Sequence, residues 1–274
     1  MALYLVTGGA GFIGSNIVRA LVQRKQPVVV LDNLSTGSLR NLEGVRENIR
    51  FLRADIRHLP AVRRACRGVT IVLHQAALRA VARSVDRPRE TSDVNVTGTL
   101  NLLLAARDAG VKRFVFASSS SVYGDVRARR NVETRLPEPA SPYAVSKLAG
   151  EHYCRVFNSL FGLHTVSLRY FNVFGPYQNP ESRYSAVIPI VVKRLLRRQA
   201  PDIHGDGHQS RDFTYVGNVV EANLRAATRR DVPPGDVFNI GNGETTSILT
   251  LVRTLQELLG TRLRSRHTPP RPGD

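Results

Sequence analysis

The chain has 274 residues, of which 42% are hydrophobic and 22% are charged. This balance excludes an intrinsically disordered chain, which combines low hydrophobicity with high charge. The length fits one large α/β domain, or one with a small satellite, because single cores stop growing at roughly 250–300 residues. No apolar run approaches the roughly 20 residues of a membrane span, so we expect no membrane partner.

The formal net charge is +17, and only four of the 39 basic residues are lysines, which leaves 35 arginines. A field of this size attracts polyanions, and binding of nucleic acid would give an affinity that falls steeply with added salt. However, the arginines form no long block, and no helix-turn-helix, zinc-finger or RNP1 pattern occurs. We therefore expect a small anionic ligand and no nucleic-acid partner.

The two cysteines, Cys66 and Cys154, do not form a CxxC motif. They predict neither a disulfide framework nor a metal site. The first residues lack the basic region and cleavage site of a signal peptide. We expect a cytoplasmic protein without a bound metal ion.

Apolar runs that are typical of strands alternate with helical patterns over residues 1–170. Strands are predicted at 2–6, 27–31, 50–53, 69–73, 112–117 and 164–169, and helices at 12–24, 59–66, 86–109 and 142–161. Such alternation predicts an α/β fold with a doubly wound, parallel Rossmann-type sheet. The run Val28–Leu31 is apolar at every position, as expected for a strand that is covered on both faces.

The pattern changes after residue 170, where Gly-Pro and Asn-Pro steps interrupt it. Helices are predicted at 186–199, 216–229 and 247–259, and a strand at 237–240. We expect residues 171–274 to form a smaller C-terminal substrate-binding domain, with 213–240 returning to the sheet. The basic, proline-rich residues 262–274 end the chain.

Gly8, Gly11 and Gly14 follow the first predicted strand and open a helix. Glycines allow a tight turn there and let a pyrophosphate approach the N–H groups at the helix start. Asp32 ends the next strand, close to the roughly 20-residue spacing at which an acid binds ribose hydroxyls. A carboxylate repels a 2′-phosphate, so the pattern predicts NAD rather than NADP. The alternative role for Asp32 is to cap a turn.

Tyr143 and Lys147 lie four residues apart, on one face of the helix that follows Ser141 and Pro142. A nearby ammonium group favours the phenolate of the tyrosine, which makes it a usable proton acceptor. The run Ser118–Ser121 ends the strand at 112–117, and ligands of open α/β sheets bind outside the carboxyl ends of strands. Serine, tyrosine and lysine in this order predict hydride-transfer chemistry, whereas a surface pair and a serine loop that satisfies its own backbone are the structural alternatives.

These motifs resemble the extended short-chain dehydrogenases, in particular the NAD-dependent nucleotide-sugar 4-epimerases. The resemblance spans the chain through TGGAGFIGS at 7–15, LDNLSTG at 31–37, HQAA at 74–77, NVTGT at 95–99, SSSSVYGD at 118–125, SPYAVSK at 141–147, LRYFNVFGP at 168–176 and SRDFTYV at 210–216. It implies 4-epimerisation of a UDP-hexose, UDP-glucose/UDP-galactose or the N-acetylated pair, through a transient 4-keto sugar. It also implies a homodimer in which helices 86–109 and 142–161 form a four-helix bundle.

The resemblance further implies the roles of single residues. Tyr143 is the acid/base, Lys147 orients the nicotinamide ribose and lowers the pKa of the tyrosine, and Ser119 binds the 4-hydroxyl group of the sugar. The residues expected to bind NAD are Gly8, Gly11, Phe12, Ile13, Gly14, Asp32, Asn33, Thr36, Gly37, Asp55, Ile56, Ala76, Ala77, Asn95, Tyr143, Lys147 and Tyr170. Those expected to bind the substrate are Arg79, Ser119, Ser120, Asn172, Arg211, Arg271 and Asp274.

Other activities of the same scaffold remain open. Dehydratases and decarboxylases of the resembled family carry an acid before the Val-Tyr-Gly sequence, where this chain has Ser120 and Ser121. Elimination needs such an extra acid and base, so the serines favour epimerisation. A four-serine loop is also found in UDP-glucuronate 4-epimerases. Because the resembled proteins continue for a few dozen residues beyond Asp274, a truncated NAD-binding module with little turnover is a further alternative.

Overall fold

The computed structural model describes residues 1–124, 131–181 and 186–269. Its centre is a parallel seven-stranded sheet in the order β11-β6-β5-β4-β1-β2-β3. The strands are β1 (Tyr4–Thr7), β2 (Val28–Asp32), β3 (Ile49–Arg53), β4 (Ile71–His74), β5 (Arg113–Ser119), β6 (His164–Tyr170) and β11 (Val237–Ile240). The fold is therefore the expected Rossmann-type α/β fold.

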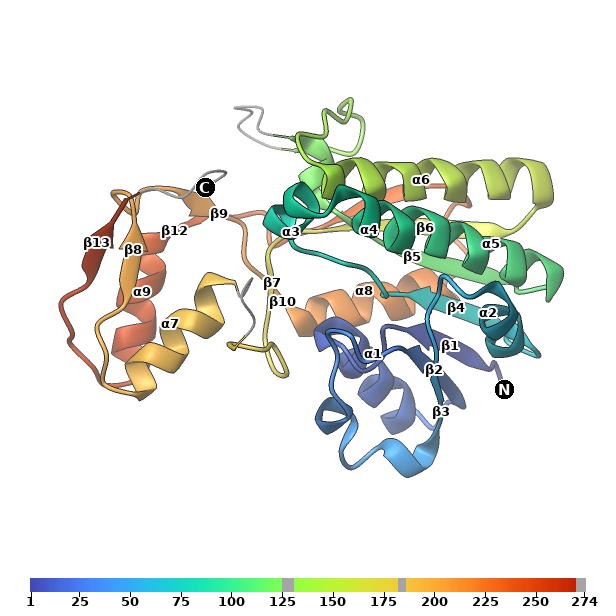
Figure 1. The fold of residues 1–274 in the computed structure, drawn as a ribbon, viewed down its shortest axis with the longest axis horizontal. Helices are drawn as coiled ribbons and strands as arrows, with labels where there is room; N and C mark the ends of the chain where they lie inside the picture. The colour runs from blue at the N-terminus through green and yellow to red at the C-terminus, as the bar shows by residue number, and fades with distance from the viewer. Residues whose placement is uncertain (125–130, 182–185, 270–274) are drawn as a thin grey trace.

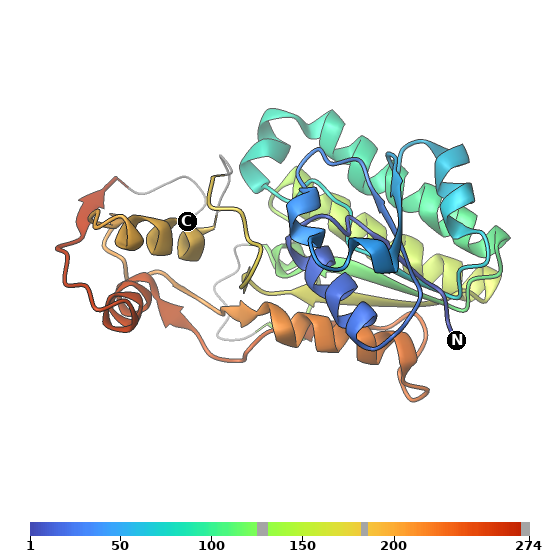
Figure 2. The same cartoon turned by 90° about the horizontal axis from the view of Figure 1, so that it is seen from below.

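Helices cover both faces of this sheet (Figures 1 and 2). One face carries α1 (Phe12–Gln23) and α8 (Val216–Thr228), and the other carries α2 (Leu59–Cys66), α5 (Gly98–Asp108) and α6 (Pro142–Phe161). Two apolar clusters fill the space between sheet and helices, one on each face. Burial on both faces explains why β2 is apolar at each position before Asp32.

Two glycines let helices approach the sheet side closely. A Cβ atom at Gly150 of α6 would lie 2.3 Å from the ring of Phe116 in β5, and one at Gly98 of α5 would lie 2.6 Å from Ile56. Larger residues would push these helices away from the core. Because α6 packs this closely on the sheet, its side chains are held at fixed positions beside the ends of β5 and β6.

The strand order reverses between β1 and β4, which are neighbours in the sheet. The connections after these strands separate there and leave a crevice at their carboxyl ends, the usual ligand site of open α/β sheets. The two connections touch, because a Cβ atom at Gly8 would lie 2.7 Å from the backbone nitrogen of Ala76. The topology therefore places both the 8–14 and the 75–79 segments at this crevice.

A second, smaller lobe lies beyond the carboxyl ends of the strands (Figure 1). It contains α7 (Val187–Leu196), β8 (Asp202–His204), β9 (Ser210–Arg211), β12 (Thr246–Ser247), α9 (Ile248–Leu258) and β13 (Arg266–Thr268), and β7 (Val173–Phe174) and β10 (Thr214–Tyr215) pair where the chain passes between the lobes. Its own apolar cluster joins α7, β8 and α9. The chain returns from this lobe through α8 and β11, and β11 pairs with β6.

The predicted single helix at 86–109 is wrong in detail. The structure has α3 (Val81–Asp86), α4 (Pro88–Ser92), a π-helical turn at Asp93–Thr97 and then α5. Proline at position 88 begins a new helix, because its ring cannot continue the preceding one. The π-helical turn contains Asn95, whose side chain is hydrogen-bonded to Leu78. Strand β4 also lies one to two residues later than the predicted 69–73.

Within the three described ranges, none of the helices combines the length and apolarity that crossing a membrane requires.

Candidate active site

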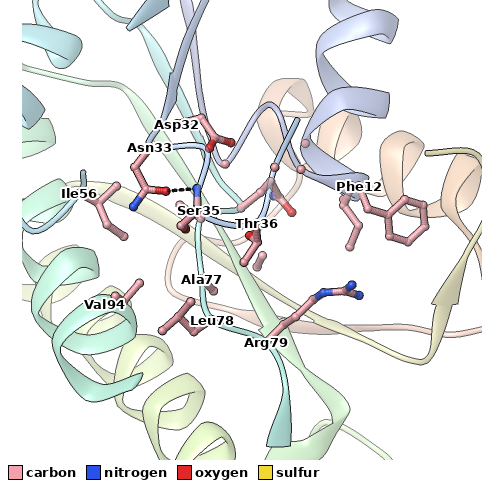
Figure 3. Close-up of a pocket in the computed structure, with 18 of the residues that line it drawn as sticks. Phe12, Asp32, Asn33, Ser35, Thr36, Ile56, Ala77, Leu78, Arg79 and Val94 are labelled. Atoms are coloured by element: carbon pink, nitrogen blue, oxygen red, sulfur yellow. Dashed lines mark hydrogen bonds between the residues drawn. The ribbon is translucent and has the colours of Figure 1, made fainter. Parts of the chain in front are cut away.

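A pocket of about 560 Å³ occupies the crevice at the carboxyl ends of the strands, a size typical of sites for small ligands. Figure 3 shows the side chains that surround it. Of the residues predicted to bind NAD or substrate, those that line the pocket are Gly8, Gly11, Phe12, Ile13, Gly14, Asp32, Asn33, Thr36, Gly37, Asp55, Ile56, Ala76, Ala77, Arg79, Tyr143, Lys147 and Tyr170. The fold thus gathers residues from positions 8 to 170 around one cavity.

The glycine segment has the close contacts that a tight turn before a helix requires. Gly8 has a φ of +66°, and a Cβ atom at Gly14 would lie 2.2 Å from the carbonyl oxygen of Gly8. Gly11 is the N-cap of α1, which has no side-chain cap and no acidic residue in its first turn. The first N–H groups of the helix are therefore left for an anion, as a pyrophosphate requires.

Asp32 holds this segment together while it faces the pocket. Its carboxylate accepts hydrogen bonds from the backbone nitrogens of Ala10 at 2.9 Å and Leu34 at 2.7 Å. Burial raises the pKa of Asp32, and the two backbone donors oppose that rise. Each carboxylate oxygen keeps a lone pair that can accept a further hydrogen bond, for example from a ribose hydroxyl group. Asp32 can thus serve both the turn and a ligand.

Polar and apolar groups meet at one end of the pocket. Asp55 accepts hydrogen bonds from Asn33 Nδ2 at 2.8 Å and from Arg57 Nη2 at 2.8 Å. Hydrogen bonding from Arg57 is the main reason that the pKa of Asp55 falls to about 2. Figure 3 shows Ile56 and Val94 near this end. Two apolar side chains beside fixed polar groups suit a flat, polar-edged ring such as adenine.

Asn95 does not line the pocket, although the sequence predicted a contact with NAD. Its amide accepts from Leu78 N at 2.8 Å and donates to Leu78 O at 3.0 Å and to Ser146 Oγ at 3.0 Å. The side chain is buried. Because every amide atom is already bonded to the protein, Asn95 fixes the pocket-lining Leu78 and ties it to α6.

His74 continues this buried network toward β1. Thr99 Oγ1 donates its hydrogen to Asn95 O, so the 2.9 Å contact between Thr99 Oγ1 and His74 Nε2 needs a proton on the ring nitrogen. His74 Nδ1 then accepts from Thr7 Oγ1 at 2.7 Å. The network is satisfied by a neutral ring, and burial, aided by the charge of Lys147, lowers the pKa of His74 to about 3.

This histidine gives the first prediction, which concerns stability in acid. The folded pKa lies below the 6.5 of a free histidine, so the unfolded chain binds the proton first and the free energy of unfolding falls as pH drops from 6.5 toward 3. Between pH 7 and pH 4.5, His74 should account for about 2.5 kcal/mol of that fall. In urea unfolding, the unfolding free energy of His74→Gln should therefore fall less between pH 7 and pH 4.5 than that of the wild type. Phe116→Leu, which changes a ring beside His74, is the control that should keep the wild-type pH dependence.

Tyr143 sits in the pocket wall at the first turn of α6, where Ser141 caps the helix and Pro142 begins it. Burial raises the pKa of the Tyr143 phenol above 10, whereas a hydrogen bond with Ser119 and the charge of Arg79 lower it. Figure 3 shows Arg79 extending toward the side of the pocket where Phe12 lies. Ser119 and Tyr143, which are separated by 24 positions in the chain, therefore meet.

Lys147 lies one turn further along α6 and is buried. Its Nζ donates to the carbonyl oxygen of Ala117 at 2.7 Å and lies 5.9 Å from the centre of the Tyr143 ring. Burial lowers the pKa of Lys147 to about 8 against the opposing charge of Glu151. The resemblance implied that Lys147 lowers the pKa of Tyr143; in the structure the groups that lower it are Ser119 and Arg79, and Lys147 Nζ is bonded to Ala117 O.

Several predicted substrate residues lie outside this pocket. Ser120 begins a 3-10 turn, and the side chain of Asn172 donates to Asp212 O at 3.0 Å. Arg211 lies on β9 of the small lobe, where its guanidinium group donates to Ser210 O. None of these three lines the pocket, and Ser119 does not line it either, although its side chain is hydrogen-bonded to the pocket-lining Tyr143. Arg271 and Asp274, also predicted, fall outside the described residues.

The structure adds pocket residues that the motifs did not indicate. Tyr177 and Asn179 reach the cofactor side from the segment that follows β7. Tyr177 stacks on Arg19 of α1 at 4.6 Å, and Asn16 Nδ2 donates to Pro176 O at 3.0 Å. The only sequence signal was the turn-forming Gly-Pro and Asn-Pro steps of this segment, which say nothing about where it docks.

The residues present fit a dinucleotide. The close-packed glycine turn, the uncapped helix start, the carboxylate after β2 and the apolar adenine end all occur in one cavity. Over the ranges that the structure describes, His, Cys, Asp and Glu side chains form no group of three that could hold a metal ion.

Comparisons with known proteins agree with this geometry. The model of the NAD dependent epimerase/dehydratase family matches residues 4–241. UDP-glucose 4-epimerase of Streptomyces lividans is 39% identical over 272 residues, which are 94% of this chain and 81% of that protein.

Two solved structures have the same fold. UDP-glucose 4-epimerase of Thermus thermophilus, in complex with NAD, has a TM-score of 0.90 and 42% identity, with 99% of this chain and 88% of that chain covered. UDP-N-acetylglucosamine 4-epimerase of Methanobrevibacter ruminantium, in complex with UDP-N-acetylmuramic acid, has a TM-score of 0.95 and 37% identity, with 100% and 87% covered.

The family model covers most of the chain, and the identities and the shared fold extend over nearly all of it. From its sequence, its fold and the glycine–Asp32 pocket, this chain is a member of the NAD-dependent epimerase/dehydratase family.

Proposed function

We propose that this protein is an NAD-dependent 4-epimerase of a UDP-hexose. The observation that carries the proposal is that Tyr143 and Lys147 both line the pocket that fits the dinucleotide, with the hydroxyl group of Ser119 hydrogen-bonded to Tyr143. NAD, when bound, supplies a hydride acceptor that returns the hydride to the same carbon. An epimerase needs little else besides a group that takes and returns one proton.

The residues of the chain divide this work between them. Tyr143 takes the proton from the 4-hydroxyl group of the sugar as C4 gives up its hydride and becomes a ketone carbon. It returns the proton to the same oxygen when the hydride comes back to the opposite face of C4, which inverts the configuration. The hydroxyl group of Ser119, hydrogen-bonded to the phenol, orients that oxygen. The Lys147 ammonium group has two N–H donors besides the one bonded to Ala117, and these suit the hydroxyl groups of a ribose.

The serine loop favours epimerisation over dehydration and decarboxylation. Ser121 donates its hydroxyl hydrogen to Ser119 Oγ at 2.9 Å, and its backbone nitrogen donates to the same atom at 3.2 Å. Position 120 is also a serine. Elimination of water would need a further acid and base beside the tyrosine. Since hydroxyl groups occupy these positions, the loop is built to orient Ser119 rather than to supply a second proton donor.

We infer that the lobe of residues 171–274, apart from the returning stretch 213–240, anchors the UDP group. Arg211 and Asn172 are the described candidates for the diphosphate and the sugar, and the planar guanidinium fork of an arginine matches phosphate geometry. Arg79 reaches the Tyr143 end of the pocket and is a candidate for the hexose. Such an arginine could also pair with the carboxylate of a uronic acid, so UDP-glucuronate is the second candidate substrate.

A substrate panel tests the proposal. Purified protein loaded with NAD is incubated with UDP-galactose, UDP-N-acetylgalactosamine and UDP-glucuronate in turn, and the sugars are identified after hydrolysis. We expect the 4-epimer from at least one of the first two. If only UDP-glucuronate is epimerised, the substrate is a UDP-uronic acid. A 4-keto-6-deoxy product would show that the reaction is dehydration and not epimerisation. No conversion by folded, NAD-loaded protein would leave only a dinucleotide-binding module.

We further propose that the protein forms a homodimer through α4, α5 and α6. Val145, Val156 and Leu160 lie along one stripe of α6 and are 52%, 43% and 70% exposed. Exposed apolar side chains in such a row are typical of helix–helix interfaces. Sedimentation equilibrium of the wild type and of Leu160→Glu measures the mass directly, and a monomeric wild type would exclude the interface.

A cytoplasmic location is proposed as well. Cys66 and Cys154 are both unpaired and buried, which fits a reducing compartment.

A further inference from the structure

A buried ion pair lies one helical turn beyond Lys147, between two residues that do not line the pocket. Arg169 of β6 donates from Nε and Nη2 to the two carboxylate oxygens of Glu151 in α6, at 2.9 and 2.7 Å. Both side chains are about 5% exposed or less. Ser118 of β5 donates its hydroxyl hydrogen to the same carboxylate. A buried ion pair costs free energy of desolvation, so stability alone is a weak reason for its presence.

The pair is joined to Lys147 by the architecture of α6 and β5. Glu151 follows Lys147 by four residues, so both side chains leave the same face of the helix. Lys147 binds the carbonyl group of Ala117, and the next residue along β5, Ser118, binds Glu151. Figure 1 shows α6 lying over β5 and β6, the strands that carry these partners. Lys147 and Glu151 are therefore hydrogen-bonded to neighbouring residues of β5, the strand that ends in Ser119.

The charged and titratable groups around Lys147 come from β4 and α6, and they include the Tyr143 phenol, whose ring centre lies 5.9 Å from Nζ. His74 of β4 is neutral, as its pKa of about 3 requires, and burial raises the pKa of Cys154 in α6 to about 12, so its thiol is neutral too. The ring of Phe116 in β5 lies 5.0 Å from Nζ. Among the described groups that act on Lys147, Glu151 thus supplies the negative charge at neutral pH. Without it, burial, which favours the neutral amine, would be opposed much less.

We propose that Glu151, anchored by Arg169 and Ser118, is a positioning residue that keeps Lys147 positively charged and directed at the Ala117 carbonyl group. The ammonium group then presents its remaining donors to the pocket. Arg169 weakens this effect on Lys147, because its positive charge partly neutralises the negative charge of Glu151. Only the catalytic consequence of this inference rests on the proposed function, because the protonation state of Lys147 can be measured without substrate.

The four lysines of the chain make that measurement practicable, because lysine labelled with ¹³C at Cε gives four side-chain signals. Lys147→Met assigns the signal of interest. In the wild type we expect a midpoint near pH 8. In Glu151→Gln the midpoint should fall by at least about one pH unit, as expected when a close opposite charge is removed. In Arg169→Gln it should rise.

The opposite shifts of the Lys147 midpoint expected in Glu151→Gln and Arg169→Gln distinguish this role from a purely structural one. If the pair served only to pack the core, either substitution would admit water and move the midpoint upward, toward that of a free lysine. An upward shift or an unchanged midpoint in Glu151→Gln would therefore overturn the proposal. Glu221→Gln removes the same charge from a surface pair with Arg24 and should leave Lys147 unaffected.

Glu151→Gln leaves the buried Arg169 without its carboxylate partner and could fail to fold. The double variant Glu151→Leu/Arg169→Met removes both charges and replaces a buried ion pair by apolar side chains, a change that proteins often tolerate. The Lys147 midpoint should fall in this variant too, because Glu151, and not Arg169, is the member of the pair whose charge acts directly on Lys147. A midpoint that stays near pH 8 in the folded double variant would also contradict the proposal.

The catalytic consequence is read from the pH dependence of kcat/KM. If Lys147 must be charged, the alkaline limb of the profile should move to lower pH in Glu151→Gln, together with the NMR midpoint. An alkaline limb that stays in place while the midpoint moves would overturn the catalytic part of the proposal. Absence of turnover in the wild type would instead count against the proposed function, and the lysine titration would still decide the role of Glu151.

Discussion

Tyr143→Phe should abolish nearly all epimerisation while the protein keeps its NAD. The substitution removes one oxygen from the pocket wall, and the ring remains to fill its place beside Ser119 and Lys147. Loss of a positioned acid/base typically lowers the rate by about 10²–10⁴-fold. Turnover of UDP-galactose and the NAD released from denatured protein are the two quantities to measure.

Tyr153→Phe is the matched control for this variant. Tyr153 lies on the same helix, packs against the apolar cluster under α5 and α6, and does not line the pocket. It should retain wild-type turnover and NAD. If Tyr143→Phe kept a substantial rate, another group would have to carry the proton, and the assignment of the acid/base would be wrong. Loss of NAD from the variant would instead point to a damaged pocket.

The second large effect is expected at Gly14. An alanine Cβ atom there would lie 2.2 Å from the carbonyl oxygen of Gly8 and 2.8 Å from Cα of Gly9. These are backbone atoms of a turn held by Asp32, so α1 would have to move away from the glycine segment. We expect Gly14→Ala to lose about 3 kcal/mol of unfolding free energy, the upper range for an overpacked site. Urea unfolding of NAD-free protein avoids the stabilisation that bound NAD would add.

Gly11→Ala should separate binding from folding. Gly11 has a φ of −79°, and the nearest atom to an added Cβ would be Gly8 O at 3.1 Å. Its stability should therefore stay within about 1 kcal/mol of the wild type. The methyl group would stand at the helix start where a pyrophosphate approaches, so we expect NAD affinity to fall at least about tenfold by calorimetry. Equal behaviour of the two alanine variants would contradict this division of roles.

The functional groups of the site lie at the ends of helices and strands. Ser119 ends β5, Tyr143 and Lys147 begin α6, and the glycine turn begins α1, so each functional group stands at the end of a regular element. Groups on rigid elements keep their geometry without help from loops. The network of Thr7, His74, Thr99 and Asn95 then fixes the 75–79 segment to the same elements.

The amino-acid sequence by itself determined the fold class and the cofactor side of the site. Both depend on local patterns: alternation of apolar strands with helices, glycines at 8, 11 and 14, an acid at 32, and the spacing of Tyr143 and Lys147. These signals are legible because each depends on neighbours within a turn or a strand. The parallel sheet confirms the predicted fold.

Only the tertiary structure decided which distant residues meet. Asn95, in the π-helical turn of the predicted 86–109 helix, bonds to Leu78, and the pocket-lining Tyr177 stacks on Arg19. The Glu151–Arg169 pair, and the turn of Lys147 toward Ala117, likewise depend on packing between α6 and two strands. Such contacts join positions that no local periodicity relates, because long-range packing depends on the whole fold.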